Sequence, residues 1–340
     1  WIEEGPFYKG RINIFFGWHV DKEDFEDFRP ELEKIGQEAR EKGAELVYIV
    51  EFGGIGLKTV EQLAELLGVD VFELLQNKKY REKLRQLLVT VRRDVEEMYE
   101  RAEEGILPSE GELEGLSEFS RAEMEFLAEH RIKTVVEALS VEAMTEGILG
   151  ELRFTQATEA LLRGNLEEYI EKRWQSLMHL AENIKLRDRD FQAQIESLGK
   201  PNRYVLSIRG GMHQVESKTE TGYEIREVRI FEPDSSPERE LFQMLVEGKE
   251  ISESEKRRFL LEDIVFLVGS ELLRRHSPPI RMDEIDKIGR AIAEKWSEEE
   301  ILQLMDRFAN SEQEGYARFL EWLSGSELPP EIKALFLGSP

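Results

Sequence analysis

The sequence of 340 residues contains no cysteine, which excludes disulfides, thiolate metal sites, iron–sulfur clusters and cysteine nucleophiles. It also contains no phosphate-binding Gly-x-x-x-x-Gly-Lys-Ser/Thr loop, no His-Glu-x-x-His zinc motif and no Gly-x-Ser-x-Gly nucleophile elbow. No run of about 18 consecutive apolar residues is present, so the sequence predicts no membrane-spanning helix.

Basic charge is also scarce, because 46 Lys and Arg stand against 71 Asp and Glu, a net charge of −25. Nucleic acids and anionic membranes bind concentrated basic faces, so neither is expected as a partner. The opening residues 1–4 have neither the basic start nor the apolar run of a signal peptide, and we expect a soluble cytoplasmic protein. Abundant Glu, Lys and Arg without cysteine is typical of heat-adapted proteins.

The first fifty residues predict a parallel βαβ unit. Arg11–Trp18 is rich in Ile and Phe and predicts a buried strand, and Glu45–Phe52 predicts a second one. Between them, Asp21–Lys42 has apolar residues at helical spacing and ends at Gly43. Two strands joined through one helix by short connections predict parallel neighbours in a sheet.

A long helical insertion is predicted next, from about residue 59 to 186. Its apolar residues recur three and four apart, which predicts helices that include Ser120–Gly147 and Asn165–Leu186. Asp188–Leu198 is then expected to form a separate short helix that ends before Gly199. The length of this block indicates that the sheet is assembled from segments on both sides of it.

Strand patterns return at Arg203–Ile208 and at Tyr223–Phe231, and the second of these alternates as expected nearer a sheet edge. The pattern after Pro237 is helical. We therefore predict an α/β fold with a mostly parallel sheet, a long helical insertion and an additional helical C-terminal region. The corresponding domains are residues 1–235 and 236–340, in line with about 150 residues per domain.

Three chemically versatile residues follow predicted strands. His19 and His213, two of only five histidines, come shortly after glycines, and Glu51 precedes a glycine pair. Ligands bind at the carboxyl ends of parallel strands, where glycine allows a sharp turn and a close approach. Two imidazoles and a carboxylate there could bind a divalent metal or act as general acid and base. Ordinary hydrogen-bonded structural roles are the alternative.

The segment Arg187-Asp188-Arg189-Asp190 is a further candidate. Its aspartates are explained as caps of the predicted short helix. The arginines Arg187 and Arg189 gain nothing from that helix terminus, and a guanidinium at this position could clamp a carboxylate or phosphate of a substrate. Exposed surface arginines are the alternative interpretation.

In order and type, these motifs resemble the superfamily of erythromycin esterases, ChaN-type proteins and TraB/Tiki metalloproteases, over about residues 10–232. The resemblance rests on Gly17-Trp18-His19 after the first strand, on Glu51 after the second, on Arg189-Asp190 in a later helix, and on the strand that leads to Gly210-Gly211-Met212-His213. Many members have Gly-Glu-x-His or Gly-Thr-x-His at the first motif, so Trp18 is a departure. The family also has a helical stretch that splits the sheet.

The resemblance implies a hydrolase of ester, lactone or peptide bonds in a small-molecule or peptide substrate. His19, Glu51 and His213 would bind a metal or activate water, and Arg189 would hold an anionic group. Metal-bound water ionises near neutral pH, which supplies a nucleophile without serine or cysteine. Two alternatives stay open: a non-catalytic acidic protein that binds a partner or forms a homo-oligomer, and a haem- or ligand-binding protein with His19 or His213 as axial ligand.

Overall fold

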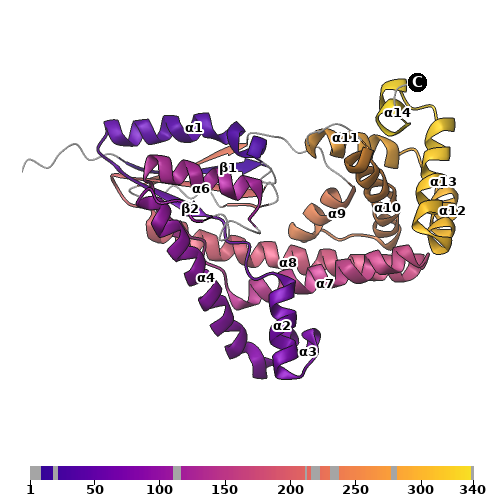
Figure 1. The fold of residues 1–340 in the computed structure, drawn as a ribbon, viewed down its shortest axis with the longest axis horizontal. Coiled ribbons are helices and arrows are strands. Elements are labelled where there is room, and N and C mark those ends of the chain that lie inside the picture. Colours follow the sequence, from indigo (N-terminus) through magenta and orange to yellow (C-terminus); the bar gives the residue numbers. More distant parts are fainter. Residues whose placement is uncertain are drawn as a thin grey trace, which may run out of the picture. The chain divides into compact units, whose positions relative to one another are not determined.

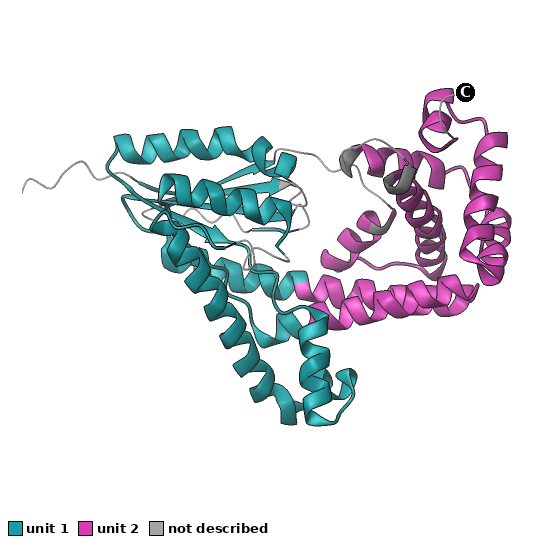
Figure 2. Cartoon of the chain, viewed as in Figure 1, with its two compact units in different colours: residues 1–145, 184–232 teal, residues 146–183, 233–340 magenta. Residues whose placement is uncertain are grey.

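The computed structural model describes residues 9–17, 22–109, 116–210, 213–215, 223–229, 237–276 and 282–337. The chain forms two compact units, shown in different colours in Figure 2. Unit 1 consists of residues 1–145 and 184–232, and unit 2 of residues 146–183 and 233–340. Part of the expected insertion thus belongs to the same unit as the C-terminal helices.

Unit 1 is built on a parallel sheet of five strands in the order β3-β2-β4-β1-β5. The strands are β1 (Gly10–Gly17), β2 (Glu45–Val50), β3 (Lys133–Val136), β4 (Arg203–Gly210) and β5 (Tyr223–Arg229). Strands from both sides of the helical stretch pair in one sheet, as the sequence predicts. The α/β class is confirmed, and β5 lies at an edge as expected.

Helices cover both faces of this sheet. One face packs against α1 (Lys22–Glu41), α4 (Arg81–Glu103) and α6 (Glu118–His130), in a core that contains Phe15, Phe28 and Phe126. The opposite face packs against Phe191 and Ile195 in the last turns of α8 (Leu166–Leu198). Figure 1 shows α1 and α6 on one side of the strands. This unit also contains α2 (Leu57–Leu67), α3 (Val71–Gln76) and a 3-10 helix, η1 (Lys78–Tyr80).

The insertion is not wholly helical, and the expected helix over residues 120–147 is wrong in its middle. Helix α6 ends at His130, the next residue, Arg131, has a φ of +49°, and β3 begins at Lys133. The strand is Lys-Thr-Val-Val, and three β-branched residues in succession favour an extended backbone. A strand of four residues is too short for helical and extended patterns to be told apart from sequence.

The expected break before Asp188 is also wrong, because α8 is one continuous helix of 33 residues. No glycine or proline interrupts the chain there before Gly199, so nothing stops the helix. Asp188 and Asp190 lie in the interior of α8, where they contact other segments. Their interpretation as N-terminal caps is therefore wrong.

Unit 2 is helical throughout its described residues. It contains most of α7 (Val141–Leu162) and of α8, followed by α9 (Pro237–Val246), α10 (Glu253–His276), α11 (Met282–Ala293), α12 (Glu298–Asn310), α13 (Glu312–Gly325) and α14 (Pro330–Leu337). A buried ion pair, Arg173 Nε to Asp263 Oδ2 at 3.0 Å, joins α8 to α10, and the Tyr169 hydroxyl donates to the same carboxylate. Among the helices described here, none has the length and apolar character that crossing a bilayer requires.

One carboxyl group is buried in the core between the sheet and its helices. Glu123 of α6 accepts hydrogen bonds from the hydroxyls of Tyr48 at 2.6 Å and Tyr99 at 3.0 Å. Burial raises the pKa of Glu123 from 4.5 to about 7, the two tyrosine hydrogen bonds oppose that shift, and the charge of Glu51 adds to it. Glu123 therefore changes charge near neutral pH inside the folded protein.

Because the pKa of Glu123 is raised in the folded protein, we expect the free energy of unfolding to fall as pH rises. Between pH 4.5 and 7 the unfolded chain releases the Glu123 proton while the folded protein keeps it, so stability falls by roughly 3 kcal/mol and then levels off. Glu123→Gln should remove this part of the pH dependence and stabilise the protein at pH 8. Urea unfolding at pH 5, 7 and 8 measures it, with Glu125→Gln on the exposed side of the same helix as control. Equal pH slopes in Glu123→Gln and wild type would contradict it.

Candidate functional site

The carboxyl ends of three neighbouring strands carry the candidate site, which lies entirely in unit 1. Glu51 directly follows β2, Glu137 follows β3, and Arg209 and His213 lie at and just after the end of β4. Helix α8 contributes Arg187 and Asp188 from the face that packs on the sheet. Of the residues predicted from sequence, Glu51, Arg187 and His213 come together, and His19 lies outside the described residues.

His213 is held by Asp188. The Nδ1 atom lies 2.5 Å from Asp188 Oδ1, and the other carboxylate oxygen accepts the backbone N–H of Gln214 at 3.0 Å. Arg209 Nη2 lies 3.0 Å from the same Nδ1. A nitrogen that donates to the carboxylate cannot also accept from arginine, and the carboxylate is closer, so we assign the proton to Nδ1. In the neutral imidazole the Nε2 atom then has a free lone pair.

The free nitrogen of His213 faces Glu51. Nε2 lies 3.7 Å from Glu51 Oε1, too far for a direct hydrogen bond. The whole of His213 is only 3% exposed, whereas the side chains of Glu51 and Asp188 are 18% and 15% exposed. Solvent therefore reaches the carboxylates on either side of a nearly buried imidazole.

Glu137 holds two arginines in the buried part of the site. Its fully buried carboxylate accepts from Arg187 Nη2 at 2.6 Å and from Arg209 Nη1 at 2.7 Å. The backbone N–H of Phe52 adds a third hydrogen bond at 3.1 Å. Charge-assisted bonds of this kind are strong and directional, so Glu137 fixes the positions of both guanidinium groups.

Arg187 connects this buried carboxylate to the exposed part of the site. Its Nη2 also donates to Glu51 Oε1 at 2.8 Å. Burial alone would lower the pKa of Arg187, but the carboxylates of Glu137 and Glu51 outweigh burial and raise it, so the side chain stays charged at any ordinary pH. Its cation therefore lies permanently beside Glu51.

Arg209 is enclosed completely. Its guanidinium lies 3.8 Å from the centre of the Phe191 ring on α8 and 3.4 Å from Asp188 Oδ1. The cation–π contact and the carboxylates replace the water that this charge loses. With a neutral His213, the site contains three carboxylates and two guanidinium groups.

Helix α8 also positions the segment that carries Glu137. Asp190 accepts the backbone N–H of Ser140 at 2.9 Å. The Gln194 side chain accepts the N–H of Ala138 at 2.9 Å and donates to the carbonyl of Val136 at 3.0 Å. Three hydrogen bonds thus attach the chain after β3 to α8, which brings Glu137 opposite Arg187.

Arg189, the residue expected to hold an anion, is not part of this cluster. Its side chain is 65% exposed and pairs with the neighbouring Asp190 at 3.2 Å. The helix period explains the difference, because consecutive residues of α8 point in directions about 100° apart. Arg187, two residues earlier, reaches the site instead.

Sequence reasoning missed Glu137, Asp188 and Arg209 as site residues. Asp188 was explained as a helix cap, which hid its contact with His213. Glu137 could be found only by recognising β3, because its significance comes from following a strand. Arg209 lies at the end of a buried strand, directly before the glycines that precede His213. A charged residue at that position was the feature of the sequence that could have identified Arg209.

The fit of a metal ion can be judged from the donor atoms. His213 Nε2 and Glu51 Oε1 are close enough to share an ion, and Asp188 orients the imidazole as the outer partner of a histidine ligand does. However, Arg187 already donates to Glu51 Oε1 and puts a fixed cation beside it. Within the described part of the chain, no three His, Asp or Glu side chains are grouped as metal ligands. Of the three metal ligands expected from the sequence, the described residues therefore bring together His213 and Glu51.

Comparisons with models of protein families, with curated proteins and with solved structures found no match to this chain. The resemblance stated above rests on the motifs alone.

Proposed function

We propose that the chain is a hydrolase of ester, lactone or peptide bonds in which His213 is the general base and Asp188 orients it. The contact between His213 Nδ1 and Asp188 carries this proposal, because a carboxylate on one ring nitrogen leaves the other able to accept a proton. A pair of this kind activates a nucleophile in many hydrolases. Here the nucleophile is water.

The proposed reaction uses these groups as follows. Water between His213 Nε2 and Glu51 gives a proton to Nε2 while its oxygen adds to the substrate carbonyl carbon. Asp188 stabilises the imidazolium that forms, and His213 returns the proton to the leaving oxygen or nitrogen as the carbon–heteroatom bond breaks. Arg187, whose guanidinium contacts Glu51, would offset the charge that develops on the carbonyl oxygen.

Activity on a panel of substrates tests the proposal. Wild-type protein should hydrolyse at least one p-nitrophenyl ester, aliphatic lactone or chromogenic peptide, and His213→Ala should lose about 10²–10⁴-fold in rate, the range for an acid–base group. Arg189→Ala is the matched control, because Arg189 directly follows Asp188 in α8 but has an exposed side chain and should keep wild-type rates. Equal rates in His213→Ala and wild type on every substrate cleaved would contradict the proposal.

Metal content distinguishes two versions of this chemistry. Because Arg187 already pairs with the carboxylate of Glu51, we expect purified protein to contain far less than one metal ion per chain. We also expect its activity to survive treatment with a chelator. Mass spectrometry of the metal content, on wild type and His213→Ala, measures this. Stoichiometric metal in wild type that disappears in His213→Ala would instead establish a metal-dependent hydrolase with His213 and Glu51 among its ligands.

A further inference from the structure

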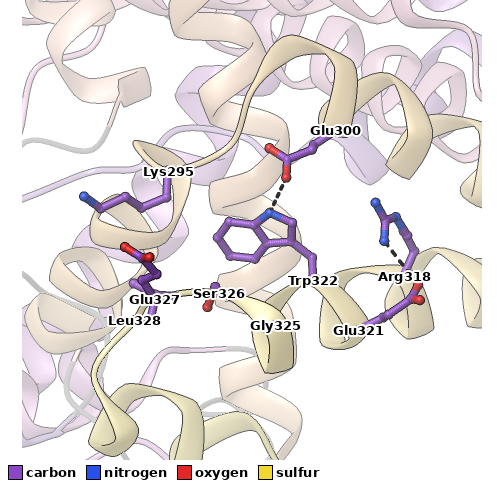
Figure 3. Close-up of a pocket in the computed structure, with 9 residues that line it drawn as sticks. All are labelled: Lys295, Glu300, Arg318, Glu321, Trp322, Gly325, Ser326, Glu327 and Leu328. Atoms are coloured by element: carbon purple, nitrogen blue, oxygen red, sulfur yellow. Dashed lines mark hydrogen bonds and ion pairs between the residues drawn. The ribbon is translucent and has the colours of Figure 1, made fainter.

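A cavity of about 670 Å³ lies in unit 2, among α12, α13 and the segments before and after them. Volumes of this size are typical of small-molecule sites. Trp322 of α13 lies at its centre in Figure 3. The cavity is lined by residues of one unit only, so it is independent of the candidate hydrolase site.

The indole ring of Trp322 is fixed in place. Its Nε1 donates to Glu300 Oε1 at 2.8 Å, and the other oxygen of Glu300 accepts both the N–H and the hydroxyl of Ser297 at 2.8 Å. The ring of Trp296 packs against it, with centroids 4.5 Å apart. Trp322 is only half-buried, so it presents a rigid apolar surface to the cavity.

Some of the charged side chains around this ring pair with other protein groups, and others do not. Arg318 pairs with Glu321 at 3.2 Å, and Glu300 is used by Trp322 and Ser297. In contrast, the side chains of Lys295 and Glu327 have no hydrogen bond or ion pair with any described residue, not even with each other. Figure 3 shows both on the same side of the indole, without a dashed contact. One positive and one negative charge, both exposed to solvent, therefore lie beside an apolar surface.

We propose that this cavity binds a small zwitterion, either an amino acid with an apolar side chain or a short peptide. Glu327 would receive the ammonium group, Lys295 the carboxylate, and Trp322 the apolar side chain. A simple cation could pair only with Glu327 and a simple anion only with Lys295, whereas a ligand with both charges can pair with both residues.

Three probes with the same phenyl group separate these cases. L-phenylalanine carries both charges, 2-phenylethylamine only the positive one and 3-phenylpropanoate only the negative one. Calorimetric titration of the full chain should show L-phenylalanine binding at least about tenfold more tightly than either of the others, as expected for one lost charge-assisted contact. The dipeptide Phe-Phe distinguishes the two sources, since tighter binding of it than of L-phenylalanine identifies a peptide ligand.

Variants of Lys295 and Glu327 test which charge of the ligand each residue binds. Lys295→Met should remove the preference for L-phenylalanine over 2-phenylethylamine, and Lys295→Arg should retain it. Glu327→Gln should remove the preference over 3-phenylpropanoate. The controls are Lys58→Met and Glu299→Gln, which change exposed charges outside the cavity lining, and circular dichroism checks that each variant is folded. The proposal is overturned if no probe binds at millimolar concentration, if 2-phenylethylamine binds as tightly as L-phenylalanine, or if Lys295→Met behaves like Lys58→Met.

Discussion

Glu137→Gln should destabilise unit 1 by about 3–5 kcal/mol, because it removes the buried carboxylate that both Arg187 and Arg209 share. The Glu137 side chain is 0% exposed and Arg209 is 1% exposed, so water cannot replace the lost charge. The amide that replaces one oxygen would moreover present N–H groups to a guanidinium that can only donate. A loss of this size is a large part of the stability of an ordinary domain.

Urea unfolding of wild type and variant measures the effect. Glu142→Gln is the matched control: Glu142 lies five residues later and pairs with Arg81, but its side chain is 45% exposed, so its loss should cost less than about 1 kcal/mol. The double variant with Arg209→Met should recover part of the loss, because it removes one uncompensated cation. If Glu137→Gln costs no more than Glu142→Gln, the two arginines do not depend on Glu137.

The sheet could be predicted from sequence where hydrophobic patterns are long. Segments such as Arg11–Trp18 and Glu45–Phe52 are continuous apolar runs closed by glycine, and each forms a strand within one or two residues of the expected ends. The strand β3 has only four residues, directly after a helix, and its pattern cannot be separated from that helix. Tertiary pairing with β2 decides its conformation.

The candidate site could be predicted only in part, and for a related reason. Residues that follow long strands, such as Glu51 and His213, were identified because strand ends place them at one edge of a sheet. Glu137 follows the short strand β3, so the sequence pattern does not identify it as a site residue. For α8, the sequence indicated arginines of interest, but choosing Arg187 over Arg189 requires the rotation of the helix against the sheet, which depends on packing of Phe191 and Ile195.

Asp188→Asn should reduce the proposed hydrolysis by about 10³–10⁴-fold while the protein remains folded. Asparagine is nearly the same size, but its amide can donate to His213 Nδ1. The imidazole would then carry its proton on Nε2, the atom that must accept one from water. The positions of the groups would be kept and the base lost, because only the carboxylate of Asp188 imposes the productive tautomer.

Two measurements separate this role from a structural one. The nitrogen NMR signals of His213 should report a proton on Nδ1 in wild type and on Nε2 in Asp188→Asn, whichever substrate is cleaved. Asp190→Asn is the matched control, because Asp190 lies two residues later in α8 and its oxygen accepts the N–H of Ser140, which an asparagine oxygen can also do. It should change the rate only a few-fold. Equal losses in both variants, or an unchanged tautomer in Asp188→Asn, would show that Asp188 supports the fold and does not direct the proton on His213.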